Sequence, residues 1–428
     1  MKRKSFIKGT VSAATLPLLL NGFSLRTFGQ SGGFPTAIDK YMDDYRSLVL
    51  IQLDGGNDGL STVIPLDQYS ALSNVRSNVL IPEKKVLALN NTVATGFHPA
   101  MDKLKNLYNN NHLTVIQGVG YPDPVFSHFR ATDIWNTGSG SDTVLSTGWI
   151  GRYLDKKFPD YPGDYPNDCF PDPPALQIGT SLSNVLRAPS VSIGMALNST
   201  SDFYNLILGN SVPETNMPWG KELAFISTTA VQSQQYLTAI KKAAVQKNLS
   251  AHYPPAYENP LADQMKIVAQ LIGGGLRTQV YVVSLQGFDT HHKQVMPSDH
   301  TKGVHARLLQ QLSDAIAAFE DDLRLMNKLD QVIGMTYSEF GRRIKSNASD
   351  GTDHGSSGPM ILFGSKLKGG IIGTNPIIPE KADVSDNLKM QYDFRSVYAS
   401  ILKGWFKMPA AEVDTLVMNK YPVLDLFN

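Results

Sequence analysis

Four predicted strands of this sequence each run into side chains that can bind metal or transfer protons. The runs "SLVLIQL", "HLTVIQGVG", "QVYVVSLQGFD" and "LDQVIGMTYSEFG" are continuously apolar, which is typical of parallel strands covered on both faces. Ligands of such sheets bind beyond the carboxyl ends of the strands, so we expect the side chains at these ends to meet. In chain order they are Asp54, Asn57 and Asp58; Ser127, His128 and Arg130; Asp289, His291 and His292; and Glu339, with Asp353 and His354 on the loop beyond it.

These residue types suit one or two divalent cations. Carboxylates and imidazoles together favour Zn²⁺ or Mn²⁺, and Ca²⁺ is a further candidate. Two such ions about 3.5–4 Å apart can clamp a phosphate-like group and activate a nucleophile. Cys169 is the only cysteine, which excludes an intrachain disulfide and a thiolate metal site.

Each position also has a purely structural interpretation. The Asp-Gly-Gly stretch at Asp54 could be only a turn, and Ser127 could cap a helix. His291 and His292 could lie on a solvated loop, and Glu339 beside two arginines could belong to a surface ion-pair cluster. The functional interpretation rests on the expectation that all four features meet at one edge of one sheet.

Helical periodicity separates the strands and predicts helices over residues 98–110, 298–326 and 393–406. We expect Asp299 or Thr301 to cap the second of these. The stretches "PMILFG" and "GGIIG" are expected to form a late strand pair.

The middle of the chain is less regular. Residues 161–174 are rich in Pro, Asp and Gly and indicate a loop, and a long helix is expected over about 221–247. We therefore expect one α/β domain over residues 45–428, with an irregular cap or insertion at about 160–278. Its core should be a three-layer sandwich, with a mostly parallel central sheet and helices on both faces.

The first thirty or so residues predict an export signal. A basic start precedes a short apolar run, Val11 to Leu20, which is too short to span a membrane. The order from Arg3 to Lys8 resembles a twin-arginine signal with Lys4 in place of one arginine, so we expect a periplasmic or extracellular protein. The alternative is an amphipathic N-terminal helix. With 39 basic and 38 acidic residues the chain has no global charge that would attract nucleic acid.

Several motifs together resemble a known family. "LIQLDGGNDGLSTVIP", "SHFRATDIWNTG", "GFDTHHKQ", "SEFGRR" and "TDHGSSGPMILFGSKLKGGIIG" resemble an exported bacterial family, domain of unknown function 1501, over about Leu48 to Phe406. That family in turn resembles a branch of the alkaline phosphatase and sulfatase superfamily. The resemblance implies an alkaline-phosphatase-like fold and a metal-activated hydroxyl that attacks phosphate or sulfate esters.

The resemblance also implies roles for individual residues. Where the superfamily usually has an Asp-His pair after a later strand, this sequence has Glu339 and Phe340. Arg130 or Arg342 would hold a nonbridging oxygen of the substrate. The implied nucleophile is Ser127, the implied metal ligands are Asp54, Asp289, His292, Glu339 and His354, and the additional candidates are His291, Asp353, Asn57 and Asp58.

The sequence thus predicts a secreted metal-dependent hydrolase of phosphate or sulfate esters, acting on a small-molecule or glycan-borne substrate. A formylglycine sulfatase is excluded, because Pro173 replaces the arginine that must follow Cys169 four residues later. The alternative is a non-catalytic binding or assembly protein with a degenerate metal site, which Glu339 and Phe340 favour. A carbohydrate-surface protein is a third interpretation, resting on scattered Tyr and Trp.

Overall fold

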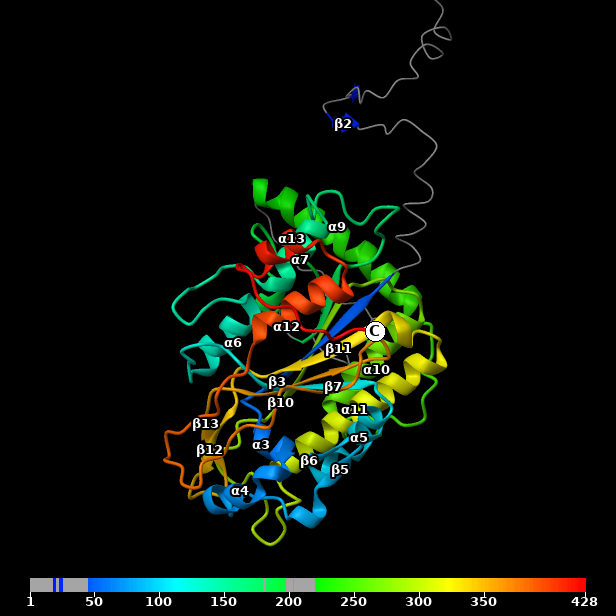
Figure 1. Ribbon diagram of the computed structural model, residues 1–428. Helices are drawn as coiled ribbons and strands as arrows, with labels where there is room; N and C mark the ends of the chain where they lie inside the picture. Colours follow the sequence, from blue (N-terminus) through cyan, green and yellow to red (C-terminus); the bar gives the residue numbers. More distant parts are fainter. Residues whose placement is uncertain (1–17, 21–22, 26–44, 180–181, 198–202, 204–219) are drawn as a thin grey trace, which may run out of the picture. The chain divides into compact units, whose positions relative to one another are not determined.

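The computed structural model of the protein (Figure 1) describes residues 18–20, 23–25, 45–179, 182–197, 203 and 220–428. The chain divides into two compact units, Met1–Tyr45 and Arg46–Asn428. In the first unit, β1 (Leu18–Leu20) pairs antiparallel with β2 (Phe23–Leu25). The twin-arginine-like stretch of the predicted export signal lies outside the described residues. No helix among the described residues is both long and apolar enough to cross a membrane.

The second unit is built on one nine-stranded sheet. Its strands are β3 (Ser47–Asp54), β7 (Leu113–Gly120), β8 (Ala175–Ile178), β9 (Met195–Leu197), β10 (Val280–Gln286), β11 (Val332–Tyr337), β14 (Gly358–Phe363), β15 (Gly370–Ile372) and β16 (Tyr392–Asp393). Their order is β15-β7-β14-β11-β3-β10-β8-β9, with β16 also beside β7. Only β14 is antiparallel to its neighbours. The mostly parallel sheet expected from the sequence is confirmed.

Helices cover both faces because the strand residues alternate between two apolar cores. In β3, Val49 and Ile51 face one core, whereas Leu48 and Leu50 face the other. Burying each such side chain stabilises the fold by about 1.5–3 kcal/mol. The first core packs against α5 (Asp102–Asn109), α9 (Gly220–Ala243), α10 (Pro260–Gly273) and α11 (Val304–Leu325). The second packs against α6 (His128–Thr137), α7 (Trp149–Lys157), α12 (Phe394–Ser400) and α13 (Ala410–Leu416), which confirms the three-layer arrangement (Figure 1).

Smaller elements complete the unit. A three-stranded antiparallel sheet joins β4 (Val63–Pro65), β6 (Thr92–Phe97) and β5 (Leu87–Leu89), and β12 (Arg342–Ser346) pairs with β13 (Thr352–His354). The short helices α3 (Gly59–Thr62) and α4 (Tyr69–Arg76) follow the first strand. Short 3-10 turns cover Leu66–Gln68, Glu83–Lys85, Pro99–Met101, Asn184–Leu186 and Leu329–Gln331, and Ile401–Trp405 is a π-helix.

Two expected details of the fold are wrong. Helix α11 starts later than predicted, with Gly303 at its N-cap, because the Asp299 carboxylate instead closes a turn with the Thr301 amide (3.1 Å) and hydroxyl (2.6 Å). The late strands β14 and β15 do not pair with each other, since both pair with β7.

The region expected to be a cap or insertion also contributes to the sheet. Strands β8 and β9 extend the sheet beyond β10, and α10 packs on the neighbouring α11. The irregular loop at 161–174 leads directly into β8.

The glycine turn after β3 brings the functional loops together. Gly55 has a φ of 123°, and a Cβ there would lie 2.2 Å from the backbone nitrogen of Asp289. A side chain is therefore excluded at this position, both by the backbone conformation and by the approaching loop. The turn after β3 and the loop after β10 can touch only because glycine stands between them.

Candidate metal centre

Histidines from three separate segments converge on one carboxylate, that of Asp289. His128, Asp289 and His354 each offer a ligand atom, and the three atoms lie within 4.8 Å of one another. The Nε2 atoms of His128 and His354 lie 3.6 Å and 3.5 Å from the Asp289 carboxylate oxygens. His291 adds a third Nε2, 3.3 Å from Asp289 Oδ1 and 2.8 Å from His354 Nε2.

The other ring nitrogen of each histidine is held by an acceptor. Nδ1 of His128 lies 2.8 Å from Glu339 Oε1, and Nδ1 of His291 lies 2.9 Å from Asp353 Oδ1. Nδ1 of His354 donates to the Phe126 carbonyl at 2.8 Å. When Nδ1 carries the proton of a neutral imidazole, Nε2 presents a lone pair. All three lone pairs then point toward Asp289, the arrangement by which proteins orient histidines around a metal ion.

The His291–His354 contact places two ring nitrogens 2.8 Å apart. If both rings carry their single proton on Nδ1, the two Nε2 lone pairs face each other and repel, so a proton or a metal cation between them would stabilise the contact. Burial, together with the charges of Arg342, His128 and His291, lowers the pKa of His354, so protonation of that ring is disfavoured.

The donor types suit a divalent cation such as Zn²⁺, whose four tetrahedral ligand atoms would lie about 3.3 Å from one another. The contacts of Asp289 with each histidine, and the contact between His291 and His354, span 2.8 Å to 3.6 Å. Among the described residues, the group whose ligand atoms all lie within 4.8 Å of one another consists of His128, Asp289 and His354, and His291 contacts two of its members. Nearly half of the Asp289 side chain (47%) is exposed, so an ion and a substrate can reach the centre from solvent.

Arg342 fixes the position of Asp289. Its fully buried guanidinium donates to Asp289 Oδ1 at 2.8 Å and to the carbonyls of Gly55, Gly56, Phe288 and Thr352. Burial alone would raise the pKa of Asp289, but the hydrogen bond and charge of Arg342, with smaller contributions from His291 and His128, lower it. Asp289 is therefore held as a carboxylate, and Arg342 joins three loops rather than standing free to bind substrate.

Glu339 and Phe340 support the histidines. Glu339 Oε1 accepts from the Gly55 amide at 2.9 Å as well as facing His128, and its side chain is buried. The ring of Phe340 lies 4.3 Å from the ring of His354 and 5.0 Å from that of His128, measured between centroids. In this geometry Glu339 orients His128, and Phe340 forms an apolar wall of the centre.

Other predicted ligands lie outside this cluster. His292 is exposed, and within the described part of the chain its side chain has no hydrogen-bond partner, whereas His291 reaches Asp289. Asp54 ends β3 as predicted, but its carboxylate is not among the ligand atoms grouped around Asp289.

Ser127 and Arg130 flank the cluster on one helix. Ser127 occupies the N-cap position of α6, yet its exposed hydroxyl makes no capping hydrogen bond. Its chain neighbours Phe126 and His128 both contact the histidine cluster, so Ser127 lies at the rim. Arg130 instead pairs with Asp133 at 2.5 Å and donates to the carbonyls of Gly140 and Thr143, which anchors the loop after α6.

Asn57 and Asp58 belong to a separate buried network. Asp58 pairs with Arg76 at 2.5 Å, and both side chains are almost fully buried. Asp58 also accepts from Gln294 at 2.7 Å, and Asn57 contacts His305 at 3.0 Å. This network braces the glycine turn against α4 and α11.

Two of these findings could not be read from sequence patterns. His128 follows the second strand and precedes a helix, so its position offered a signal, but only the structure shows its Nε2 facing Asp289. Gln294 and Arg76 carry no recognisable motif and become visible only as partners of Asp58.

The predicted family resemblance is confirmed by comparison with known families. Residues 215–416 match the family described as "Protein of unknown function (DUF1501)", and the matched segment includes Asp289, His291, Glu339 and His354. A comparison of the sequence with curated proteins finds no match.

Solved structures with a similar course of the chain come from the alkaline phosphatase and sulfatase superfamily. The C-terminal periplasmic domain of EcEptC from Escherichia coli is 10% identical, with a TM-score of 0.38, over 88% of this chain and 86% of that one. A Bacteroides thetaiotaomicron protein of glycosaminoglycan metabolism is 12% identical, with a TM-score of 0.41, over 88% and 75%. The alkaline phosphatase from the Antarctic bacterium TAB5 is 11% identical, with a TM-score of 0.30, over 75% and 92%.

Proposed function

We propose that the protein is a metal-dependent hydrolase of phosphate or sulfate esters whose ion is held by His128, Asp289, His291 and His354. The observation that carries the proposal is the convergence of three histidines on Asp289, each with its Nδ1 held by an acceptor. Zn²⁺ is the ion that this nitrogen-rich donor set favours, with Mn²⁺ next. A divalent cation there would supply Lewis-acid polarisation of the ester's nonbridging oxygen.

The chain's own residues supply the rest of the chemistry. Ser127 is the proposed nucleophile, because its hydroxyl is exposed, free of a capping bond and next in sequence to His128. The first N–H groups of α6 have no partner within the helix and favour an anion, so they would hold the ester group beside Ser127. Asp54 is kept as the candidate ligand for a second cation, because it ends β3 at the same edge of the sheet.

A panel of aryl phosphates and sulfates tests the proposal with the full chain. With Zn²⁺ or Mn²⁺ added, we expect hydrolysis of at least one ester, lost on chelation and in the variants Ser127→Ala and His128→Ala. His292→Ala is the matched control, because this histidine neighbours His291 but lies outside the cluster. Equal rates for wild type and Ser127→Ala would reject the nucleophile, and no hydrolysis of any ester with a bound ion would reject the enzyme.

One observation favours the second candidate function, a non-catalytic binding or assembly protein. The Phe340 ring packs against both His128 and His354 and occupies space beside the ligand atoms. If the ion binds but no ester is hydrolysed, this second function is the better explanation. Replacing Phe340 with histidine should then increase ion binding without creating turnover.

The proposal places this activity outside the cytoplasm, on the basic start and short apolar run of the N-terminal sequence. Fractionation of cells expressing the full chain tests it. Recovery in the cytoplasm alone would reject export, and loss of export when the twin-arginine pathway is inactivated would identify the route.

A further inference from the structure

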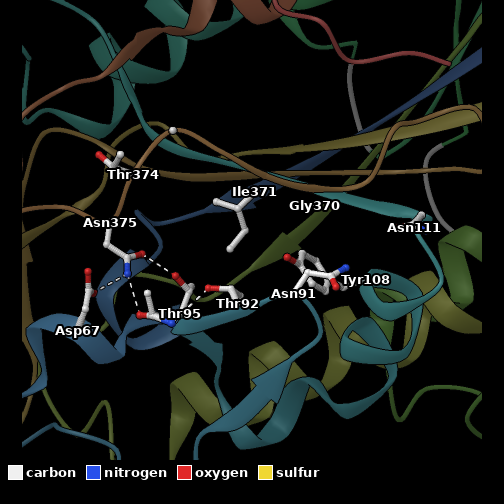
Figure 2. Close-up of a pocket in the computed structure, with 12 residues that line it drawn as sticks. Asp67, Asn91, Thr92, Thr95, Tyr108, Asn111, Gly370, Ile371, Thr374 and Asn375 are labelled. Carbon is white, nitrogen blue, oxygen red and sulfur yellow. Dashed lines mark hydrogen bonds between the residues drawn. The ribbon is translucent and has the colours of Figure 1, made fainter.

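Two cavities of several hundred Å³ open on the described part of the molecule. One, of about 410 Å³, lies beside edge strand β15, and Figure 2 shows its polar side chains bonded to one another. Asn375 donates to Asp67 at 2.6 Å and to the Ala94 carbonyl at 2.8 Å, and accepts from Thr95 at 2.8 Å. Its polar groups are therefore largely occupied, and no lysine or arginine lines it.

The second cavity, of about 570 Å³, is lined in part by polar side chains that have no hydrogen-bond partner among the described residues, and it lies near the strand ends that carry the histidine cluster. It lies at the carboxyl ends of β8 and β10, between the starts of α10 and α11. Gln286, which lines it, is in register with Asp54 and precedes Asp289 by three residues. The cavity therefore opens on the same edge of the sheet as the histidine cluster, where ligands of parallel sheets bind.

The cavity lies beside the short strand β8. β8 pairs with β10 only as far as Val282, and among the described residues no strand pairs with that edge of β10 from Ser284 onward. The side chain of Gln264 bonds to this edge instead, accepting from the Ser284 amide at 3.1 Å and donating to its carbonyl at 2.9 Å. The cavity lies at this edge, with Ile178, Leu285 and Leu308 as apolar lining.

An exposed tyrosine stands at the mouth of this cavity. Tyr257 is 83% exposed and has a φ of 71°, a backbone conformation that is costly for an aromatic residue. Its amide donates to Asp263 at 2.9 Å, which holds the turn in this conformation. The next residues are tied to α11, where Gln311 donates to the Glu258 carbonyl and accepts from Asn259 through its own carbonyl. The ring is thus held out in solvent by a rigid turn.

Two polar side chains that line this cavity have no hydrogen-bond partner among the described residues, and one of them is a cation. The side chains of Arg307 and Gln286 are exposed and have no hydrogen-bond partner among the described residues. The cavity therefore combines an aromatic face, an apolar floor, an amide, a guanidinium and the Asp263 carboxylate, which accepts from the Tyr257 amide. A sugar ring has the complementary surface, since its C–H face packs on an aromatic ring and its hydroxyls bond to amides, while Arg307 suits an anionic substituent.

We infer that this cavity is a saccharide subsite, and that the ester substrate is borne on an anionic glycan whose neighbouring sugar stacks on Tyr257. The inference rests on the proposed function for the identity of the ester but not for sugar binding itself. The subsite would select the substrate, whereas the histidine cluster would carry the chemistry.

A glycan array tests the inference with the full chain kept metal-free by chelation. We expect binding to at least one sulfated, phosphorylated or uronic-acid-containing oligosaccharide, and dissociation constants at least tenfold weaker in Tyr257→Ala and Arg307→Gln. Tyr257→Phe should bind like wild type, because it keeps the ring, and Ile377→Ala serves as the control at another highly exposed apolar residue. Thermal unfolding of each variant shows that it is folded.

The outcomes separate this inference from the proposed function. No oligosaccharide bound on the array, or unchanged binding in both Tyr257→Ala and Arg307→Gln, would overturn the subsite. Sugar binding without ester hydrolysis would leave the subsite standing and reject the hydrolase. Hydrolysis of small aryl esters that Tyr257→Ala leaves unchanged, with a raised KM only for glycan esters, would support both.

Discussion

Removal of the Glu339 carboxylate should weaken metal binding although Glu339 is not expected to touch the ion. Its Oε1 accepts from the Gly55 amide at 2.9 Å and faces His128 Nδ1 at 2.8 Å. Residues that orient a histidine ligand in this way typically contribute 10–100-fold in metal affinity. For Glu339→Gln, which can keep both contacts but lacks the charge, we expect about a tenfold weaker Zn²⁺ complex, or about 1.4 kcal/mol.

Glu339→Ala should lower both the affinity for Zn²⁺ and the stability of the metal-free protein, and the two effects can be measured separately. The loss of the acceptor frees the His128 ring, so the affinity should fall by about 100-fold. The buried Gly55 amide also loses its partner, which should cost about 1–3 kcal/mol of unfolding free energy in the metal-free protein. Asp168→Asn is the charge-matched control, because this exposed carboxylate has no hydrogen-bond or ion-pair partner among the described residues.

Competition with a chromophoric chelator measures the affinity, and urea unfolding of the metal-free protein measures the stability. A Zn²⁺ affinity of Glu339→Ala equal to that of Asp168→Asn would refute the role of Glu339 in orienting His128. A lower stability with unchanged affinity would show that Glu339 serves the glycine turn alone.

Three further predictions concern the histidines and the buried network. His291→Ala should weaken Zn²⁺ binding by more than the roughly 10–100-fold expected for loss of an orienting residue, whereas His292→Ala should leave the affinity unchanged. If a competition assay instead shows a larger loss of affinity in His292→Ala than in His291→Ala, His292 is the ligand. Asp58→Asn leaves the Arg76 guanidinium buried without its counter-charge, and should cost about 3–5 kcal/mol in urea unfolding; a loss below about 1 kcal/mol would contradict a buried pair. Burial lowers the pKa of His305 to about 4. Because the unfolded chain alone takes up this proton as the pH falls below about 6.5, stability should fall by about 1.4 kcal/mol per pH unit from this group, and an unchanged pH slope between 7 and 5 in His305→Asn would disprove it.

The sheet could be predicted from the sequence because its strands are buried on both faces. The continuous apolar runs at β3, β7, β10 and β11 favour a covered parallel sheet, and these four strands lie within a few residues of the predicted runs. The N-cap of α11 could not be predicted, because the Asp299 carboxylate can accept hydrogen bonds either from a helix N-terminus or from a nearby turn. In the structure it accepts from the Thr301 amide and hydroxyl, in a turn that precedes the helix. The order of β14 and β15 depends on long-range pairing with β7, which no local pattern encodes.

The candidate site could be predicted as a place but not as a set of ligands. Strand ends brought Asp289, His354 and Glu339 into the right region, since that edge follows from topology. The choice between His291 and His292 depends on which ring faces inward after the turn at Asp289, and adjacent residues in a loop give no periodic signal. The sequence predicts Glu339 as a metal ligand, whereas in the structure Glu339 orients His128, which faces Asp289 instead. This difference depends on one contact of 2.8 Å between Glu339 and His128, which lie far apart in the sequence.

The charge distribution around the histidines explains why an anionic ester should need the ion. Asp289, Asp353 and Glu339 contact the histidines directly, whereas two guanidiniums lie beside them: that of Arg342 pairs with Asp289, and that of Arg343 donates to the His354 carbonyl. Burial raises the pKa of Tyr337, and the charges of Glu339 and Asp54 raise it further, so a fourth carboxylate, that of Asp54, lies near the others. Such a site repels phosphate or sulfate until a divalent cation offsets the excess negative charge. We therefore expect inorganic phosphate to bind the Zn²⁺-loaded protein and not the metal-free protein in calorimetry, and equal binding to both would place the anion site away from the histidine cluster.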